Sequence, residues 1–550
     1  MRWYTLLCIY ATLVTTCANS DKDSLLVHTT SGEVRGYRDP DGDYFAFYGI
    51  PYATAPTGPD RFKAPLPPST WQQPLDAVDS RICPQVSSYS ANMQENCLVA
   101  NVFVPDTDIK KLPVLVVVHG GAFEVGYGNL YNVKELMRSK KFVAITFNYR
   151  LGVHGFLCLG TKDAPGNAGM KDQVALLRWV NQNIANFGGN PDDVTISGSS
   201  AGSASVNLLM VSKITRGLFN KVIADSGSHF AQFAVQRDPL KNARKLAKLL
   251  DSTINENDVY ALEELYKTFP YEQLMMNTFT NRTDSAIDFS PCVERDLGDE
   301  IFLDDDPVNI VKTGEYTKVP LLYSTTNMEG LLRVGLFDDW KIKMNENFNE
   351  FLPEDLQFES INERERISKT VKEFYFGRKP VSNEKILSYV DYFTDVIFVY
   401  PTLRSITTQV EGGHDKIYLY EYSFVDDNDP LIPYTNVRGA THSAQTKVVF
   451  DRVTLPENAT ESEEYKNVKS VLTEIWTNFV TTGTPAPECS SLPTWPPVGA
   501  DRSPHMSIGL SVELRGSLLK QHARFWDKIY AKYYRPPLPP PAPPTRRSDN

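Results

Sequence analysis

The sequence predicts an α/β fold with a large, mostly parallel central sheet flanked by helices, in a single large domain. Continuous apolar runs such as LPVLVVVHG at 112–120 and KKFVAITFNYR at 140–150 indicate strands buried on both faces, as in a parallel sheet. Between two strand-like runs, four apolar residues recur at helical spacing: Val174, Leu177, Val180 and Ile184. Gly188 then ends the predicted helix. Strands that alternate with helices are typical of α/β architecture.

Strand-like segments continue along the chain, and we expect the whole set in one sheet. Four further runs follow the first two: DVTISG at 193–198, GLFNKVIADSG at 217–227, KVPLLYST at 318–325 and HDKIYLYEYSF at 414–424. The segment LLKQHARFWDKIYAKYY at 518–534 is amphipathic and predicts a helix. In folds of this kind the active site lies at the carboxyl ends of the strands.

The two ends of the chain differ from the globular part. The first twenty residues place Arg2 before an apolar run and finish in small residues, which is typical of a secretory signal. That run is too short to cross a bilayer, and no later run has the ~20 apolar residues that a membrane span requires. The opposite end is rich in proline, which favours a disordered tail, with a docking peptide as the alternative. The predicted organisation is a signal at 1–20, one α/β domain at 21–535 and a tail at 536–550.

The net charge disfavours two classes of partner. The signal contains one Arg and no acidic residue, so its removal takes the formal net charge from −11 to −12. This charge argues against nucleic acid or an anionic membrane surface as the main partner. We expect a secreted, extracellular protein with glycosylation acceptors at Asn281 and Asn458.

Five cysteines follow the signal, and an extracellular location permits disulfides. Cys83 and Cys97 are near enough in sequence to close a short loop. Cys158 lies in the apolar stretch GFLCLG, which favours a buried structural thiol. Because five is an odd number, at least one thiol stays free, and the sequence does not decide the state of Cys292 or Cys489.

The serine-rich stretch ISGSSAGSAS at 196–205 contains a G-x-S-x-G motif at 198–202. It follows a predicted strand and precedes a helix-compatible segment, which is the context of a nucleophile on a sharp strand-to-helix turn. Ser200 alone occupies the central position of the motif. The amides at the start of the helix would favour negative charge beside it. The motif without this context is a weak signal, and a solvated loop is the alternative.

A serine nucleophile needs a base, and the base needs an acid that orients it. His442, in GATHSAQ, follows a strand and a loop near the carboxyl end of the chain, and we predict it as the base. Glu329, in YSTTNMEG, follows the strand-like KVPLLYS and is predicted as the acid. The order serine, acid, histidine along the chain is the one that this fold uses.

An acyl-transfer site also needs donors for the oxyanion, each worth about 3 kcal/mol in the transition state. The segment VVVHGGAFEVG places a glycine pair after a buried strand, and the amides of Gly121, Ala122 and Ala201 are the predicted donors. A plain glycine-rich turn is the alternative, and a phosphate loop is disfavoured because no Lys-Ser/Thr follows. We expect neither a metal nor a cofactor.

Over about residues 25–530 the chain resembles the type-B carboxylesterase family, the cholinesterase-like branch of the α/β-hydrolases. Its landmarks occur in order: FYGIPYATAPTGPDRFKAP, ENCLVANVFVP, VHGGAF, NYRLGVHGFL, the block APGNAGMKDQ to ISGSSAG, NMEG and GATH. The resemblance implies the same triad, Ser200, Glu329 and His442, and the same oxyanion donors. It also implies a Cys83–Cys97 disulfide and two structural ion pairs, Arg150 with Asp172 and Arg61 with Glu95.

Several positions depart from the family pattern. Ser199 stands where many members carry an acidic residue, and the juvenile hormone esterases typically carry glutamine there. The segment between Cys83 and Cys97 is short and lacks the tryptophan that binds quaternary ammonium groups in cholinesterases, so choline esters are not the expected substrate. The whole pattern is most similar to insect secreted esterases.

The sequence therefore predicts a secreted serine carboxylesterase that acts through an acyl-enzyme on small-molecule esters. Odorant or pheromone, hormone and xenobiotic esters are the candidate substrates, and the oligomeric state is not predicted. The alternative from another class is a catalytically silent, esterase-like adhesion or binding protein. Such relatives usually lack a triad residue and carry a membrane span, unlike this sequence. A lipase or a protease remains a third reading, because the triad serves any acyl group.

Overall fold

The protein is represented by a computed structural model that describes residues 23–40, 42–86, 92–276, 278–279, 282–451 and 461–544. The predicted signal at 1–20 and both predicted glycosylation acceptors, Asn281 and Asn458, lie outside the described residues.

The described strands form one 13-stranded sheet, in the order β1-β2-β3-β5-β7-β6-β8-β9-β10-β11-β12-β13, with β4 paired to β2. Their bounds are β1 Ser24–Thr29, β2 Gly32–Arg38, β3 Tyr44–Pro51, β4 Leu75–Asp76, β5 Val99–Pro105, β6 Leu112–Val118, β7 Val143–Phe147, β8 Gly189–Ser199, β9 Lys221–Asp225, β10 Leu321–Thr326, β11 Ile417–Tyr422, β12 His505–Ile508 and β13 Val512–Arg515.

The centre of the sheet is parallel and its edges are antiparallel. Neighbours from β7 through β6, β8, β9, β10 and β11 to β12 all run parallel. The edge pairs β1–β2, β2–β3, β3–β5, β5–β7 and β12–β13 are antiparallel. All six strand-like runs of the sequence lie on the parallel strands β6 to β11, so the predicted α/β fold is confirmed.

Successive residues of a central strand point to opposite faces of the sheet, and each face is covered by its own apolar core. Because both faces are buried, the central strands contain continuous apolar runs. On β6, Val114 and Val116 belong to the larger core, whereas Leu115 and Val117 belong to the smaller one. Helices α4 (Ala168–Asn183), α5 (Ala201–Val211) and α15 (Lys520–Tyr533) contribute to the larger core. Helices α2 (Lys134–Met137), α13 (Ala444–Val449) and α14 (Glu463–Thr482) contribute to the smaller.

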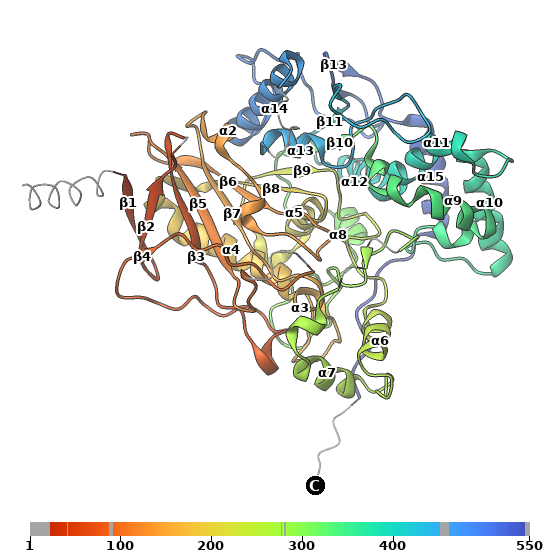
Figure 1. The fold of residues 1–550 in the computed structure, drawn as a ribbon, viewed down its shortest axis with the longest axis horizontal. Helices are drawn as coiled ribbons and strands as arrows, with labels where there is room; N and C mark the ends of the chain where they lie inside the picture. Colours follow the sequence, from red (N-terminus) through yellow and green to blue (C-terminus); the bar gives the residue numbers. More distant parts are fainter. Residues whose placement is uncertain are drawn as a thin grey trace, which may run out of the picture.

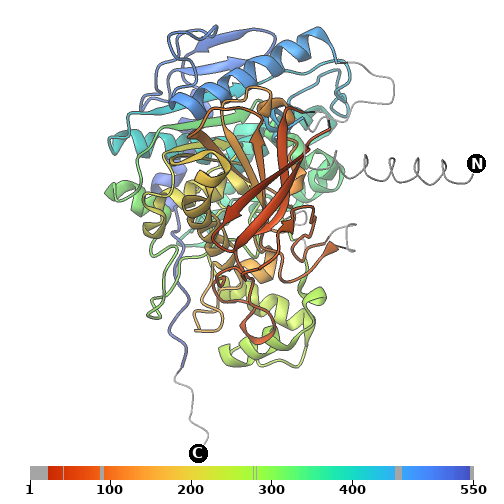
Figure 2. The ribbon, with the colours of Figure 1, turned by 90° about the vertical axis from the view of Figure 1, so that its left-hand side faces the viewer.

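Most of the helices between β9 and β11 lie outside the sheet, in two separate groups. Figure 1 shows α9 (Phe337–Glu346), α10 (Ile361–Phe376), α11 (Ile386–Phe393) and α12 (Tyr400–Glu411) at the right, beside α15. Helices α6 (Pro239–Leu250) and α7 (Val259–Thr268) lie at the bottom of the same view. Figure 2 shows α14 lying across the top of the molecule. The helix predicted around Val174 is α4, which continues into the 3-10 helix η4 (Ile184–Phe187). Gly188 ends η4 in the left-handed conformation, as expected.

Two disulfides are present among the described residues. Cys83 pairs with Cys97, the pair that the family resemblance implies, and Cys158 pairs with Cys292 across 134 residues of sequence. Cys158 is therefore not the free buried thiol that its apolar setting suggested. The absent side chain of Gly166 makes room for this bond, because a Cβ there would lie 2.6 Å from the Cys292 sulfur and 2.8 Å from that of Cys158. Cys489 is free and exposed.

The proline-rich end, which we expected to be disordered, is described to residue 544 and its first part lies against the domain. Pro537 and Pro540 are buried three residues apart, which matches the threefold repeat of a polyproline helix. Arg295 donates from Nε and Nη2 to the Pro540 carbonyl at 3.0 and 2.9 Å, and Pro540 packs against Gly160. Proline lacks an amide donor but keeps its carbonyl, so a neighbouring guanidinium can fix such a segment.

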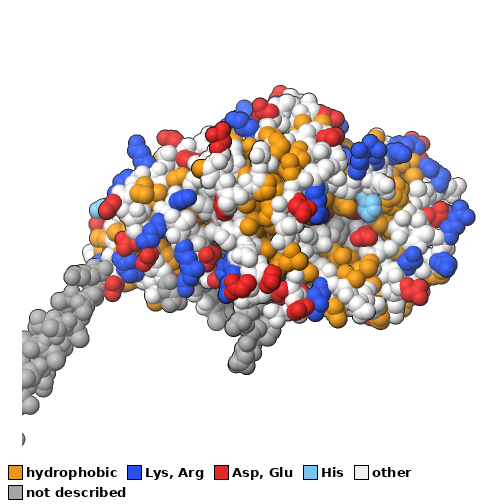
Figure 3. Space-filling model, turned by 90° about the horizontal axis from the view of Figure 1, so that it is seen from above, with side chains coloured by type: hydrophobic (Ala, Val, Ile, Leu, Met, Phe, Trp, Pro, Cys, Tyr) orange, Lys and Arg blue, Asp and Glu red, His pale blue; other side chains and the backbone are white. Residues whose placement is uncertain are grey.

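The described helices include none that is long and apolar enough to cross a membrane. Seen from above in Figure 3, the surface mixes charges of both signs with apolar side chains, several of which adjoin one another near the middle of this face. Mixed surfaces of this kind are ordinary for globular proteins.

Candidate active site

Ser200 lies at the sharp turn between β8 and α5. Its backbone has φ 58° and ψ −121°, a conformation that a non-glycine residue rarely adopts and that is typical of strained functional positions. A Cβ on Gly198 would lie 2.3 Å from the Gly202 carbonyl oxygen, and one on Gly202 would lie 2.2 Å from that of Val118. The turn is possible only because both motif positions are glycine.

His442 and Glu329 form a buried pair. Nδ1 of His442 donates to Oε2 of Glu329 at 2.6 Å, and the other oxygen of Glu329 accepts from the Thr326 amide at 2.8 Å. Glu329 is fully buried after the end of β10, so this carboxylate is held in one orientation. With Nδ1 engaged, Nε2 of the imidazole is left for a reacting hydroxyl.

Ser200 and His442 line the same cavity, which has a volume of about 570 Å³. One part of its lining is polar: Gln85, Glu124, Ser199, Ser443 and Lys447. Another part is apolar: Val86, Val125, Leu130, Phe279 and Leu332. A largely apolar cleft with a few convergent polar groups is the usual form of a small-molecule site.

The loop after β6 approaches Ser200 closely, because a glycine pair follows His119 at its start. A Cβ on Gly120 would lie 2.5 Å from the Ser199 carbonyl oxygen and 3.2 Å from the Ser200 Cβ. Gly121 has φ 110°, and a Cβ there would lie 2.0 Å from the Val125 carbonyl oxygen. Ala122 follows with φ 56° and also lines the cavity. Ala201, the first residue of α5, follows Ser200 directly.

Ser199 and Ser443, each next to a predicted triad residue, bond to one another across the site. Their hydroxyl oxygens are 2.7 Å apart. The sequence marked Ser199 only as a departure from the family pattern and did not predict its partner, because the two residues are 244 positions apart.

A buried carboxyl that the sequence did not single out lies behind the site. Asp225 ends β9, and its carbonyl accepts from the Ser200 amide at 2.9 Å. Its carboxylate accepts hydrogen bonds from Ser324 and Thr446. Burial, joined by the nearby charge of Glu329, raises the pKa of the Asp225 carboxyl to about 6, although these hydrogen bonds act in the opposite direction.

The two ion pairs implied by the family resemblance are both present in the structure. Arg150 Nη2 lies 2.6 Å from Asp172 Oδ1, with both side chains almost fully buried. Arg61 Nε lies 3.1 Å from Glu95 Oε1. Removing one partner of a fully buried pair costs about 3–5 kcal/mol, so Arg150 and Asp172 hold the fold together.

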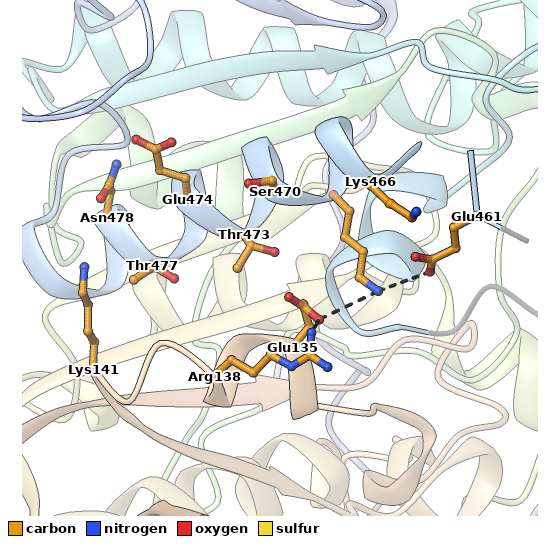
Figure 4. Close-up of a pocket in the computed structure, with 11 residues that line it drawn as sticks. Glu135, Arg138, Lys141, Glu461, Lys466, Ser470, Thr473, Glu474, Thr477 and Asn478 are labelled. Carbon is orange, nitrogen blue, oxygen red and sulfur yellow. Dashed lines mark hydrogen bonds and ion pairs between the residues drawn. The ribbon is translucent and has the colours of Figure 1, made fainter. Parts of the chain in front are cut away.

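A second pocket lies on the surface between α2 and α14 (Figure 4). Charged side chains line it, and several are already paired: Glu135 accepts from Arg138 at 2.8 Å, and Lys469 donates to Asp451 at 2.7 Å. It contains none of the predicted triad residues. Within the described part of the chain, no group of three or more His, Cys, Asp or Glu residues has an arrangement suited to a metal ion.

Comparison with known proteins agrees with this geometry. The model of the carboxylesterase family matches residues 23–526. The chain belongs to the carboxylesterase family. This carboxylesterase is 34% identical to Esterase FE4 of Myzus persicae over 518 residues, which cover 88% of each protein. It is also 34% identical to the juvenile hormone esterase of Heliothis virescens over 502 residues, covering 86% of this chain and 88% of the relative.

Among solved structures, the carboxylesterase resembles the juvenile hormone esterase from Manduca sexta with OTFP covalently attached. The TM-score is 0.82 at 30% sequence identity, covering 92% of this chain and all of the other. A PNB esterase is also similar, with a TM-score of 0.71 at 28% identity. These relatives make the chain a carboxylic ester hydrolase with an α/β-hydrolase fold.

Proposed function

We propose that this carboxylesterase hydrolyses its esters through a Ser200–Glu329–His442 triad and an acyl-enzyme intermediate. His442 takes the hydroxyl proton of Ser200 as its oxygen attacks the ester carbonyl, and then gives that proton to the leaving alcohol. Water next attacks the acyl group with the same base, which releases the acid and restores the serine. Glu329 orients the imidazole and stabilises its cation.

The observation that carries this proposal is the 2.6 Å hydrogen bond from His442 to the buried Glu329, beside a cavity that also contains the strained Ser200. The amides of Gly121, Ala122 and Ala201 are the proposed oxyanion donors. Two observations support this assignment. The glycine pair has no side chains that would keep the loop away from Ser200, and α5, whose first amides favour negative charge, begins directly after the nucleophile.

For the substrate, we propose small odorant or pheromone, hormone or xenobiotic esters. The apolar lining of the cavity suits an alkyl group, and its volume suits a small molecule. Two relatives are juvenile hormone esterases by name, and another is Esterase FE4 of Myzus persicae. Within the protein, the proposed division is a signal at 1–20, the esterase domain at 21–535 and a proline-rich tail at 536–550. Secretion is supported by the signal pattern and by two disulfides.

Hydrolysis of p-nitrophenyl esters from acetate to octanoate, by the wild type and by Ser200→Ala, tests the proposal. We expect the wild type to turn over these esters and Ser200→Ala to lose at least about a thousandfold in kcat. Ser470 is an exposed serine on α14 in the surface pocket of Figure 4, and Ser470→Ala is the control that should retain full activity. A wild type that hydrolyses no ester would favour a silent binding protein, and an active Ser200→Ala would remove Ser200 as the nucleophile.

A further inference from the structure

Glu124 is a buried carboxylate in the wall of the cavity that the proposed mechanism does not use. It follows Gly121 and Ala122 by a few residues in the loop after β6, and only 2% of its surface is exposed. Its carboxylate accepts three hydrogen bonds from a segment 154 residues away in sequence. Oε1 accepts from the Thr278 amide at 2.8 Å and from the Thr278 hydroxyl at 2.5 Å, and Oε2 accepts from the Phe279 amide at 3.3 Å.

Two of the three bonds of Glu124 come from main-chain amides, one of them the amide of the cavity residue Phe279. Phe279 lines the same cavity as Ser200, and its backbone amide is held by Glu124. The ring has a second contact: the guanidinium carbon of Arg333 lies 4.0 Å from its centre, within the range of a cation–π interaction. Phe279 is thus held from the backbone side and from the ring side.

Arg333 belongs to the 3-10 helix η8 (Glu329–Leu336), which begins with the proposed triad acid. It is buried, its carbonyl accepts from the Tyr389 hydroxyl at 2.9 Å, and its guanidinium also lies 5.4 Å from the Trp340 ring centre. Phe279 therefore contacts both the loop that carries the proposed oxyanion donors Gly121 and Ala122 and the helix that carries Glu329. A shift of Glu124 or of Arg333 would therefore move Phe279, which forms one apolar wall of the cavity.

We propose that Glu124 is a positioning residue that fixes Phe279 as a wall of the ester pocket and thereby sets the preference of the enzyme for the length of the apolar chain of its substrate. The proposal rests on the esterase function proposed above and assigns a role within the same site. Glu124 does not touch the reacting atoms in this scheme. A short acetyl group needs no distant wall, whereas a medium acyl chain gains its affinity from apolar contacts of the kind that Phe279 offers.

Glu124→Gln is the first test, because the amide keeps one acceptor oxygen and replaces the other with a donor facing the Phe279 amide. For p-nitrophenyl octanoate we expect KM to rise about tenfold, and for p-nitrophenyl acetate we expect a rise in KM that is smaller by about fivefold or more. Thr278→Ala removes the hydroxyl that donates to Glu124 and that also accepts from the Asp288 amide at 3.3 Å, and it keeps the Thr278 amide bond to Glu124. It should change KM in the same direction by a smaller factor. It also keeps the proposal testable if Glu124→Gln fails to fold.

Glu474, on α14 in the surface pocket of Figure 4, offers a control that is matched in its number of hydrogen bonds. Its carboxylate also accepts three hydrogen bonds from two neighbouring residues: from the Ser490 hydroxyl at 2.6 Å, the Ser491 amide at 3.1 Å and the Ser491 hydroxyl at 2.7 Å. Glu474→Gln changes the same number of hydrogen bonds at a partly exposed position away from the cavity, and it should leave the chain-length profile unchanged.

Phe279→Ala decides whether Glu124 acts through this ring. If it does, adding Glu124→Gln to Phe279→Ala should change the octanoate-to-acetate ratio of kcat/KM by less than about twofold. Additive effects, or an unchanged profile in an active Glu124→Gln enzyme, would overturn the proposal and leave the esterase function standing. A wild type without activity on any ester would instead refute the proposed function itself.

Discussion

The ring of Phe398 stacks on the imidazole of His442, with centroids 4.1 Å apart and planes inclined by 23°. Phe398 lies in a π-helix, η11 (Thr394–Val399), which also contacts the acid-bearing segment. There Thr394 Oγ1 accepts from the Gly330 amide at 2.9 Å, directly after Glu329. A wide helical turn of this kind often occurs at functional sites. One element thus supports both members of the proposed histidine–glutamate pair.

Phe398→Leu should lower kcat by about threefold to tenfold, because an aromatic pair contributes about 0.5–1.5 kcal/mol beyond its buried area. Leucine keeps most of the apolar contact and removes the stacking that aligns the imidazole. Steady-state kinetics on p-nitrophenyl acetate measure the change. Phe398→Tyr retains the ring and serves as the control, and a Leu variant with unchanged kcat would show that the stack does not orient His442.

Glu329→Gln should reduce kcat by about a thousandfold to ten-thousandfold while the fold is retained. The neutral amide has the same shape, yet it cannot stabilise the imidazolium and can turn its NH₂ group toward Nδ1, which disfavours the productive tautomer. Kinetics together with circular dichroism separate this effect from unfolding. Glu300→Gln, an exposed glutamate paired with Arg178, is the control and should behave as the wild type. Full activity in Glu329→Gln would refute the triad.

The buried Asp225 predicts a pH dependence of stability. Its pKa is raised to about 6 in the folded protein, against about 3.9 for an unfolded aspartate. The folded state therefore keeps a proton that the unfolded chain has already lost between these values. The stability that Asp225 contributes is fully present below about pH 4 and declines by about 3 kcal/mol as the pH rises through 6.

Asp225→Asn removes this titration, so the Tm of the variant relative to the wild type should be higher at about pH 7.5 than at about pH 4.5. The asparagine loses one acceptor toward Ser324 or Thr446, which costs stability equally at both pH values and cancels in the comparison. Thermal unfolding at the two pH values provides the measurement. An offset between variant and wild type that does not change with pH would show that Asp225 ionises normally in the folded state.

Features governed by short segments were predictable from the sequence. A local apolar run predicts each central strand from β6 to β11, and the G-x-S-x-G motif contains the two glycines that allow the turn at Ser200. Glu329 and His442 were predicted from chain order and strand ends, and their side chains lie 2.6 Å apart in the structure.

Features that depend on distant segments were not predictable. Cys158 and Cys292 are 134 residues apart, and nothing near either one marks its partner. The carboxylate of Glu124 meets its three donors only once two loops have been placed side by side. Asp225 appears in the sequence as the end of an ordinary strand, and its raised pKa arises from burial after folding. Such pairings follow from tertiary packing, which local patterns do not encode.

The docked proline-rich segment provides the last prediction. Deleting residues 536–550 should lower the Tm, because Arg295 loses the Pro540 carbonyl and Gly160 loses its covering residue. A hydrogen bond to a charged group contributes about 1.5–3 kcal/mol when it is well shielded, and Arg295 is only partly buried, so we expect a decrease of about 1–3 °C with kcat unchanged. Deleting only residues 545–550 leaves both contacts in place and is the matched control. Equal Tm values for the two truncated proteins would mean that the contacts of Pro540 add nothing to the stability of the domain.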